Sequence, residues 1–156
     1  VEKGVEGVAD SGILAGFPII DYKVKILDGL HHDVDSSVLA FEIASRACFR
    51  DACQKATLKL LEPMMKVEVV TPEEFMGDIM GDISGKRGKI MGMESDGSFQ
   101  VIKAQVPQAE LYHYATTVRS LTGGRGLHTE SFSHYEKMPK EFEKKVIESR
   151  QSKDDE

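Results

Sequence analysis

The sequence has few cysteines, no long apolar run and no excess of positive charge. Its two cysteines, Cys48 and Cys53, lie in a helical pattern, where their side chains diverge by about 140° around the helix axis and do not easily form a disulfide. No run approaches the roughly 18 apolar residues of a membrane span, and the residues from Val1 to Gly4 do not resemble a signal peptide. These absences predict a soluble, intracellular chain with reduced cysteines.

The charge balance restricts the nucleic-acid contacts that the chain can make. Twenty Lys and Arg residues stand against 26 Asp and Glu, which gives a net charge of −6 and argues against the broad basic surface of a duplex-DNA binder. The phosphate-binding motif of P-loop proteins is also absent, because the turn Gly85–Gly88 lacks its spacing and its hydroxyl residue. We therefore expect local RNA contacts at most, and no nucleotide hydrolysis by this chain.

Residues 1–62 are predicted to form a first unit with a small hydrophobic core. Helical spacing of apolar residues up to Gly12 predicts a helix, and the alternation over Tyr22–Leu27 predicts a strand. The polar loop Asp28–Ser37 then leads into a long helix that starts at Val38, with Asp35, Ser36 or Ser37 as its cap. A 60-residue unit of this kind buries little surface, so we expect it to need strands from upstream sequence or support from the second unit.

Residues 63–139 read as a second unit of βαββαβ order. A strand over Met65–Val69 precedes Thr71-Pro72-Glu73-Glu74, which predicts a helix N-terminus capped by Thr71. Gly85 and Gly88 end this helix, and Asp96-Gly97 predicts a hairpin between strands 89–93 and 99–106.

A repeated sequence pattern within this unit supports the predicted order of elements. Pro72 and Pro107 both open helices, and an Arg-Gly pair follows each helix. With a last strand over 127–135, the fold class is α+β: a ferredoxin-like antiparallel sheet with both helices on one face. Residues 140–156 are predicted to form a C-terminal helix whose tail frays from Gln151 onward.

The densest group of potential ligands or acid–base groups is His31, His32, Asp33 and Asp35. Imidazole and carboxylate groups within one loop can converge on a metal ion, and this pattern leaves a metal-dependent hydrolase open as an alternative function. No second cluster completes a coordination sphere, so a solvated polar loop is the favoured interpretation and no metal or catalytic residue is assigned.

Two further groups concern surfaces. Lys86-Arg87-Gly88-Lys89 is a compact basic cluster at a helix-to-strand turn, where a phosphate backbone could approach. In the last strand, His128 and His134 share parity with Glu130 and Phe132, which predicts that all four lie on one face of a solvated or interface-facing edge strand.

Long segments of the sequence resemble bacterial translation elongation factor G, and together they cover nearly the whole chain. The longest match runs over residues 61–78, followed by 81–83 and 87–93. The others are residues 12–18, 24–37, 114–116, 119–120, 124–126 and 134–135.

The resemblance implies a fragment that contains part of one domain and the whole of the next. Residues 1–62 would be the C-terminal part of domain IV, a ribosomal-protein-like α/β unit, and residues 63–139 would be the ferredoxin-like domain V. The GTPase domain would be missing, so GTP and Mg²⁺ would bind upstream and this chain would be neither an enzyme nor a cofactor carrier. A cytoplasmic location is implied as well.

The resemblance also implies function and partners. Factors of this family move transfer RNA and messenger RNA through the ribosome, with domain IV reaching the decoding site and domain V contacting ribosomal RNA and protein near the stalk base. Upstream domains of the same protein would be further partners, with no DNA or membrane among them. The contact residues would be those of the loop and the basic turns: Asp28, Gly29, His31, His32, Asp35, Lys86, Arg87, Lys89 and Arg125.

Some positions depart from the family pattern. Glu130 stands where the family commonly has methionine, and Leu30-His31 replaces a typically small residue plus an aromatic or polar one. These departures favour a diverged paralogue, for which ribosome recycling and ribosome protection are the alternatives to translocation.

Overall fold

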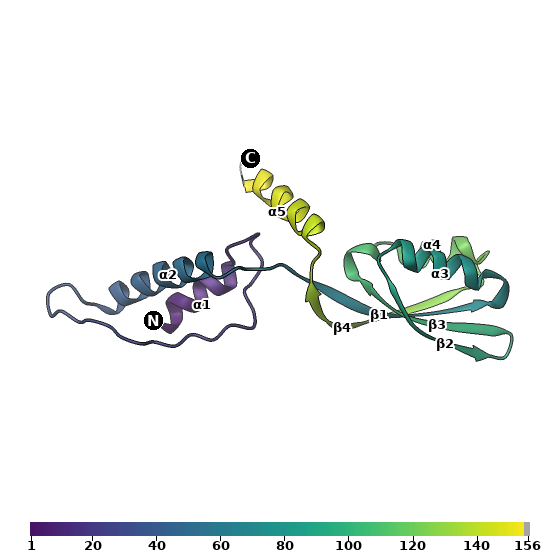
Figure 1. The fold of residues 1–156 in the computed structure, drawn as a ribbon, viewed down its shortest axis with the longest axis horizontal. Coiled ribbons are helices and arrows are strands. Elements are labelled where there is room, and N and C mark those ends of the chain that lie inside the picture. The colour runs from purple at the N-terminus through teal and green to yellow at the C-terminus, as the bar shows by residue number, and fades with distance from the viewer. Residues whose placement is uncertain (155–156) are drawn as a thin grey trace. The chain divides into compact units, whose positions relative to one another are not determined.

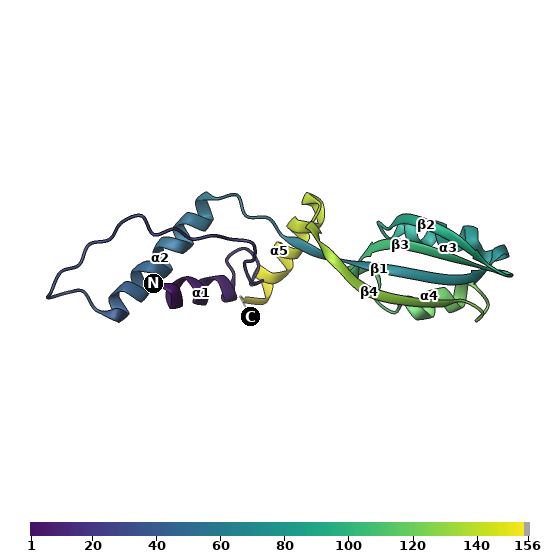
Figure 2. The same ribbon diagram turned by 90° about the horizontal axis from the view of Figure 1, so that it is seen from below.

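The computed structural model describes residues 1–154 of the chain, which divide into two compact units. Residues 1–60 and 138–154 form unit 1, and residues 61–137 form unit 2. Both units are drawn in Figure 1 and, from below, in Figure 2. No helix among the described residues is long and apolar enough to cross a membrane.

Unit 2 is a four-stranded antiparallel sheet in the order β2-β3-β1-β4. The strands are β1 (Leu61–Pro72), β2 (Lys89–Asp96), β3 (Phe99–Pro107) and β4 (Leu127–Lys137). Helices α3 (Met76–Gly85) and α4 (Tyr114–Leu121) cover the same face of this sheet (Figures 1 and 2). The ferredoxin-like fold predicted from the βαββαβ pattern is confirmed.

The core of unit 2 lies between the sheet and its two helices. Side chains alternate between the faces of a strand, so one parity of β1 and of β3 points toward the helices. The buried core residues are Val67, Val69, Ile79, Ile83, Ile102, Ala104, Val106, Leu111, Tyr114 and Val118. Each fully buried aliphatic side chain in such a core contributes about 1.5–3 kcal/mol, so this interface holds the unit together.

The hairpin is confirmed and the helix start is corrected. Asp96 pairs with Phe99 across a turn in which Gly97 has φ +61°, a conformation that favours glycine. Thr71, however, does not cap a helix: it is fully buried and pairs with Gln100 of β3, so the strand continues through Pro72. A 3₁₀ turn over 73–75 follows, and α3 begins at Met76.

The end of α3 shows how Arg87 is held. The Gly88 amide donates to the Ile83 carbonyl oxygen at 2.8 Å, and Arg87 has φ +57°, which together form a C-terminal cap of the Schellman type. The left-handed position usually carries glycine, because a side chain there costs roughly 1–2 kcal/mol. Arg87 therefore occupies a strained backbone position.

Unit 1 contains α1 (Glu2–Ser11), α2 (Val38–Lys55) and α5 (Lys140–Asp154). Apolar residues of α1 pack against Phe49 and Cys53 of α2. The two helices approach closely at Gly4, where a Cβ atom would collide with the Ser45 side chain. The expected cap of α2 is confirmed, because the Ser37 hydroxyl accepts a hydrogen bond from the Ala40 amide at 3.0 Å.

The strand predicted over Tyr22–Leu27 is wrong for this structure, because these residues have no regular secondary structure. Their apolar residues alternate as in a strand, but no described strand lies beside them to complete a ladder, and Ile26 is 66% exposed. The tail predicted to fray from Gln151 belongs to α5 as far as Asp154. The rest of that predicted tail, residues 155–156, lies outside the described residues.

A buried carboxylate fixes α5 within unit 1. Glu143 is 8% exposed, and its Oε1 atom accepts a hydrogen bond from the Leu60 amide at 2.9 Å. The Lys59 ammonium lies 3.7 Å from the other oxygen. Burial of this carboxylate is thus compensated by one backbone donor and one positive charge.

Candidate functional site

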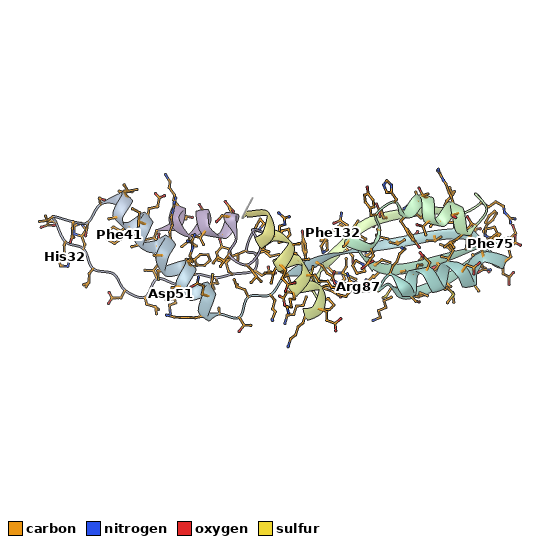
Figure 3. All side chains as sticks on the ribbon, turned by 90° about the horizontal axis from the view of Figure 1, so that it is seen from above. His32, Phe41, Asp51, Phe75, Arg87 and Phe132 are labelled. Atoms are coloured by element: carbon orange, nitrogen blue, oxygen red, sulfur yellow. The ribbon has the colours of Figure 1, made fainter. Side chains whose placement is uncertain are left out.

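The loop that precedes α2 ends in a tight turn at His32. The His32 amide donates to the Ser36 hydroxyl at 2.8 Å, and the Ser36 amide donates back to the His32 carbonyl oxygen at 3.0 Å. This reciprocal pair closes residues 32–36 around the exposed tip. Figure 3 shows His32 at the end of the loop, beyond Phe41 of α2.

The neighbouring side chains of the loop are partly engaged. The His31 ring stacks on the Phe41 ring at 6.4 Å between centroids, and its Nδ1 atom lies 3.7 Å from an Asp33 carboxylate oxygen. Asp28 Oδ1 accepts the Gly29 amide at 2.7 Å, and Asp35 accepts the Ser36 hydroxyl at 3.4 Å. The His32 ring makes no hydrogen bond or ion pair with any described residue, so it is presented to solvent.

The loop does not gather its ligands around one point. Among the side chains of residues 1–150 no group of three or more His, Cys, Asp or Glu is placed to hold a metal ion. The geometry therefore gives no support to the metal-dependent hydrolase that the loop composition left open.

The basic turn is divided between internal and exposed side chains. Arg87 donates from Nη1 and Nη2 to the two Glu62 oxygens at 2.9 Å each, and from Nε to Glu110 at 3.1 Å. The hydrogen bonds to Glu62 are the largest cause of a raised pKa of Arg87, and the hydrogen bond to Glu110 raises this pKa further. Lys86 lies 3.8 Å from Asp82 and 5.9 Å above the Tyr114 ring. Lys89 is exposed on β2 and forms no ion pair with a described residue.

Arg125 is half exposed and also has partners within unit 2. Its Nη2 atom lies 2.6 Å from Glu74, and its guanidinium stacks 4.9 Å from the Phe75 ring centroid. Its carboxylate partner is itself exposed, so the pair is screened by water. Figure 3 labels Phe75 and Arg87, which belong to unit 2.

The parity predicted for β4 is broken by a bulge. Phe132 pairs with Met65 and His134 with Met64, so Ser133 is an extra residue and His134 falls on the face opposite to Phe132. His134 instead contacts Ser133 and Glu136 at 2.8 Å each. His128, Glu130 and Phe132 pair with Val69, Val67 and Met65, so the predicted shared face is confirmed for these three and wrong for His134. An inserted residue of this kind leaves no signal in strand alternation.

One concave feature of unit 1 was not indicated by the sequence pattern. A cleft of about 570 Å³ lies along α1 and α2, lined by Gly7, Ser11, Arg46 and Arg50 among others. Arg46 pairs with Glu42 at 2.6 Å within α2, and a Cβ atom at Gly7 would touch the Arg46 guanidinium. The spacing of these residues on two helices could have indicated the cleft only if the packing of the helices had been known.

Comparisons with known proteins agree on one family. Residues 1–57 match the family model for elongation factor G, domain IV, and residues 59–146 match the model for the elongation factor G C-terminus. The elongation factor G of Aquifex pyrophilus is 52% identical over 147 residues, which is 94% of this chain and 21% of that protein. A crystal structure of a Thermus thermophilus protein superimposes with a TM-score of 0.88 at 39% identity, covering 97% of this chain and 23% of that one.

These matches describe adjoining parts of a translation factor. The chain belongs to the elongation factor G family and contains domain IV and C-terminal sequence without the GTPase domain. It spans about a fifth of the length of the relatives that it matches.

Proposed function

We propose that this chain is the ribosome-binding C-terminal part of an elongation-factor-G-like GTPase that promotes movement of transfer RNA and messenger RNA. The observation that carries the proposal is the closed turn at residues 32–36, which presents His32 in a chain whose family matches cover domain IV and the C-terminus. In this proposal the loop contacts RNA at the decoding site through Asp28, Gly29, His31, His32 and Asp35.

The proposed action of the loop is positional. Asp28, Asp33 and Asp35 make it acidic, so it attracts no phosphate, whereas an imidazole donates or accepts a hydrogen bond with a base or sugar. The Ser36 hydrogen bonds preorganise the turn, which lowers the entropy that contact with RNA would otherwise cost.

Unit 2 supplies the second proposed contact, with ribosomal RNA and protein near the stalk base. Lys89 and Arg125 offer the more exposed positive charges of the basic turns. Lys86 and Arg87 belong to the same surface, but their carboxylate partners Asp82, Glu62 and Glu110 neutralise much of their charge. GTP and Mg²⁺ would bind an upstream domain of the full-length protein, in the cytoplasm.

Co-sedimentation with purified bacterial 70S ribosomes tests ribosome binding. The chain should pellet with ribosomes and should be displaced by full-length Aquifex pyrophilus elongation factor G, because both would occupy the same site. Absence of pelleting at low salt, or pelleting that the full-length factor does not reduce, would contradict the proposal.

A chimaera separates translocation from the paralogue alternatives. The chain replaces the corresponding segment of the Aquifex factor. Messenger RNA movement, subunit splitting and release of a bound ribosome-targeting antibiotic are then measured on the same ribosomes. Translocation at a rate near that of the parent supports the proposed function. Splitting without translocation would assign recycling instead, and release of a bound ribosome-targeting antibiotic without either would assign protection.

A further inference from the structure

The strand register of unit 2 brings together polar side chains that the sequence pattern did not place side by side. We propose that a row of four side chains across the open face of the unit 2 sheet binds phosphate groups of an RNA strand. This lysine row consists of Lys89, Gln105, Lys66 and Ser131, one residue from each strand. The proposal deepens the proposed ribosome binding and rests on it for the identity of the RNA.

The row exists because of the strand register. Lys66 of β1 pairs with Gln105 of β3 on one side and with Ser131 of β4 on the other. Gln105 pairs in turn with Lys89 of β2. Directly paired residues project from the same face, so residues that lie up to 65 positions apart in the sequence form one line across the sheet.

The face of the row is the one without helices. Val67 and Ala104 form a buried pair in the core under α3 and α4, and Ile90 packs against the same core. Lys66, Gln105 and Lys89 are the immediate neighbours of these residues along their strands and therefore project from the opposite face. Lys66, Lys89 and Ser131 are exposed, and Gln105 is half exposed.

The row has positive charge that no described residue neutralises. Neither Lys66 nor Lys89 forms an ion pair with a side chain of residues 1–150. In the next row of the face the charges are compensated, because Lys103 pairs with Glu94 at 2.6 Å and its pKa is raised further by the charge of Glu68. The lysine row thus presents two ammonium groups with an amide and a hydroxyl as additional donors.

The spacing favours a polymer of phosphates over a single anion. Lys66 and Lys89 lie on strands two apart, and neighbouring strands are ~4.8 Å apart, so their backbones are separated by roughly 10 Å. Each lysine can meet a different phosphate of one strand, with Gln105 between them. The row offers no aromatic ring on which a base could stack, so the predicted contact is to the backbone and insensitive to sequence.

The experiment measures binding of the 156-residue chain to a fluorescent 12-nucleotide oligouridylate between 20 and about 200 mM salt. The variant Lys66→Gln with Lys89→Gln removes both charges and keeps polar side chains. Loss of two single-strand phosphate contacts should flatten the slope of log K against log salt by about 1.4. The control Lys144→Gln with Lys145→Gln changes the net charge equally on the exposed face of α5 and should leave the slope unchanged.

Circular dichroism of both variants confirms that they fold, as expected for exposed substitutions. Any of three outcomes would overturn the row as an RNA site. The row variant leaves the salt slope unaltered, the control variant changes the slope equally, or the parent chain does not bind the oligouridylate at 20 mM salt. Reduced ribosome binding with unchanged oligouridylate binding would also overturn it, because the row would then face a protein. Failure of the parent chain to bind ribosomes, with the oligouridylate result intact, would reject only the proposed function.

Discussion

The Arg87 ion pairs should dominate the stability of the basic turn, and removal of the guanidinium tests this directly. Arg87→Ala deletes two hydrogen bonds of 2.9 Å to Glu62 and one of 3.1 Å to Glu110. The side chain of Glu62 is only 7% exposed, so an unpaired carboxylate remains in a buried site. Such a loss costs 3–5 kcal/mol for a fully buried pair, and the 22% exposure of Arg87 lowers the expected value to about 3 kcal/mol.

Two companion variants separate the charge from the backbone. Arg87→Gly removes the same ion pairs but relieves the left-handed conformation at φ +57°, so it should be about 1 kcal/mol more stable than Arg87→Ala. In a Glu62→Gln background the buried charge is absent, and Arg87→Ala should cost only about 1 kcal/mol. The coupling energy between positions 62 and 87 is then about 2 kcal/mol.

Amide hydrogen exchange at Val67 and Ile102 measures the unfolding free energy of unit 2 alone, because both residues lie in its core. The surface variant Lys89→Gln serves as the control and should change this free energy by less than about 0.5 kcal/mol. If Arg87→Ala behaves like Lys89→Gln and the coupling energy is zero, Glu62 does not hold the guanidinium in solution.

Three further outcomes are expected. Burial, and then the negative charge of Asp82, raise the pKa of Tyr114 above its ordinary value of 10.0, so the folded state keeps the phenol proton that the unfolded chain releases. The free energy of unfolding should therefore fall as the pH rises above about 10, and Tyr114→Phe should remove part of that fall. Urea titrations at alkaline pH measure this, and an identical pH dependence in the variant would contradict the expectation. A thiol reagent should modify exposed Cys48 well before Cys53, whose pKa is raised by burial, and mass spectrometry of the peptides checks the order. In a full-length chimaera, His32→Ala should slow translocation while GTP hydrolysis stays unchanged and stability changes by less than about 0.5 kcal/mol, whereas equal translocation rates would remove His32 from the proposed contact.

The fold of unit 2 could be predicted because its signals are local. Each signal acts within a few residues, and all of them indicate the same order of elements. They are the alternation of apolar residues in β1 and β3, the prolines at 72 and 107, and the turn at Gly97. The prediction failed where tertiary structure decides between local choices. Thr71 has the sequence of a helix cap, but the ladder to β3 and its burial keep it in the strand.

The candidate site was less accessible from sequence for the same reason. The loop at His32 is local, and its capping residues were recognisable. The partners of Arg87 lie 25 and 23 residues away, so nothing near the basic turn indicates that its arginine is internally bound. Lys66 joins Lys89 only through the register of three strand pairs, and a one-residue shift would place it on the other face.

The two register shifts of the unit 2 sheet both fall on its outer strands. Met91 is the extra residue of β2 and Ser133 that of β4, whereas the inner pair β1–β3 runs without interruption from Met64 to Pro72. An outer strand carries a line of unpaired amides and carbonyls that can recruit the outer strand of another molecule. A bulge bends that line and divides it into short pieces that another straight strand cannot match. The irregularities therefore interrupt both edges of the sheet, and we expect deletion of either extra residue to give a continuous edge that promotes edge-to-edge aggregation at high protein concentration.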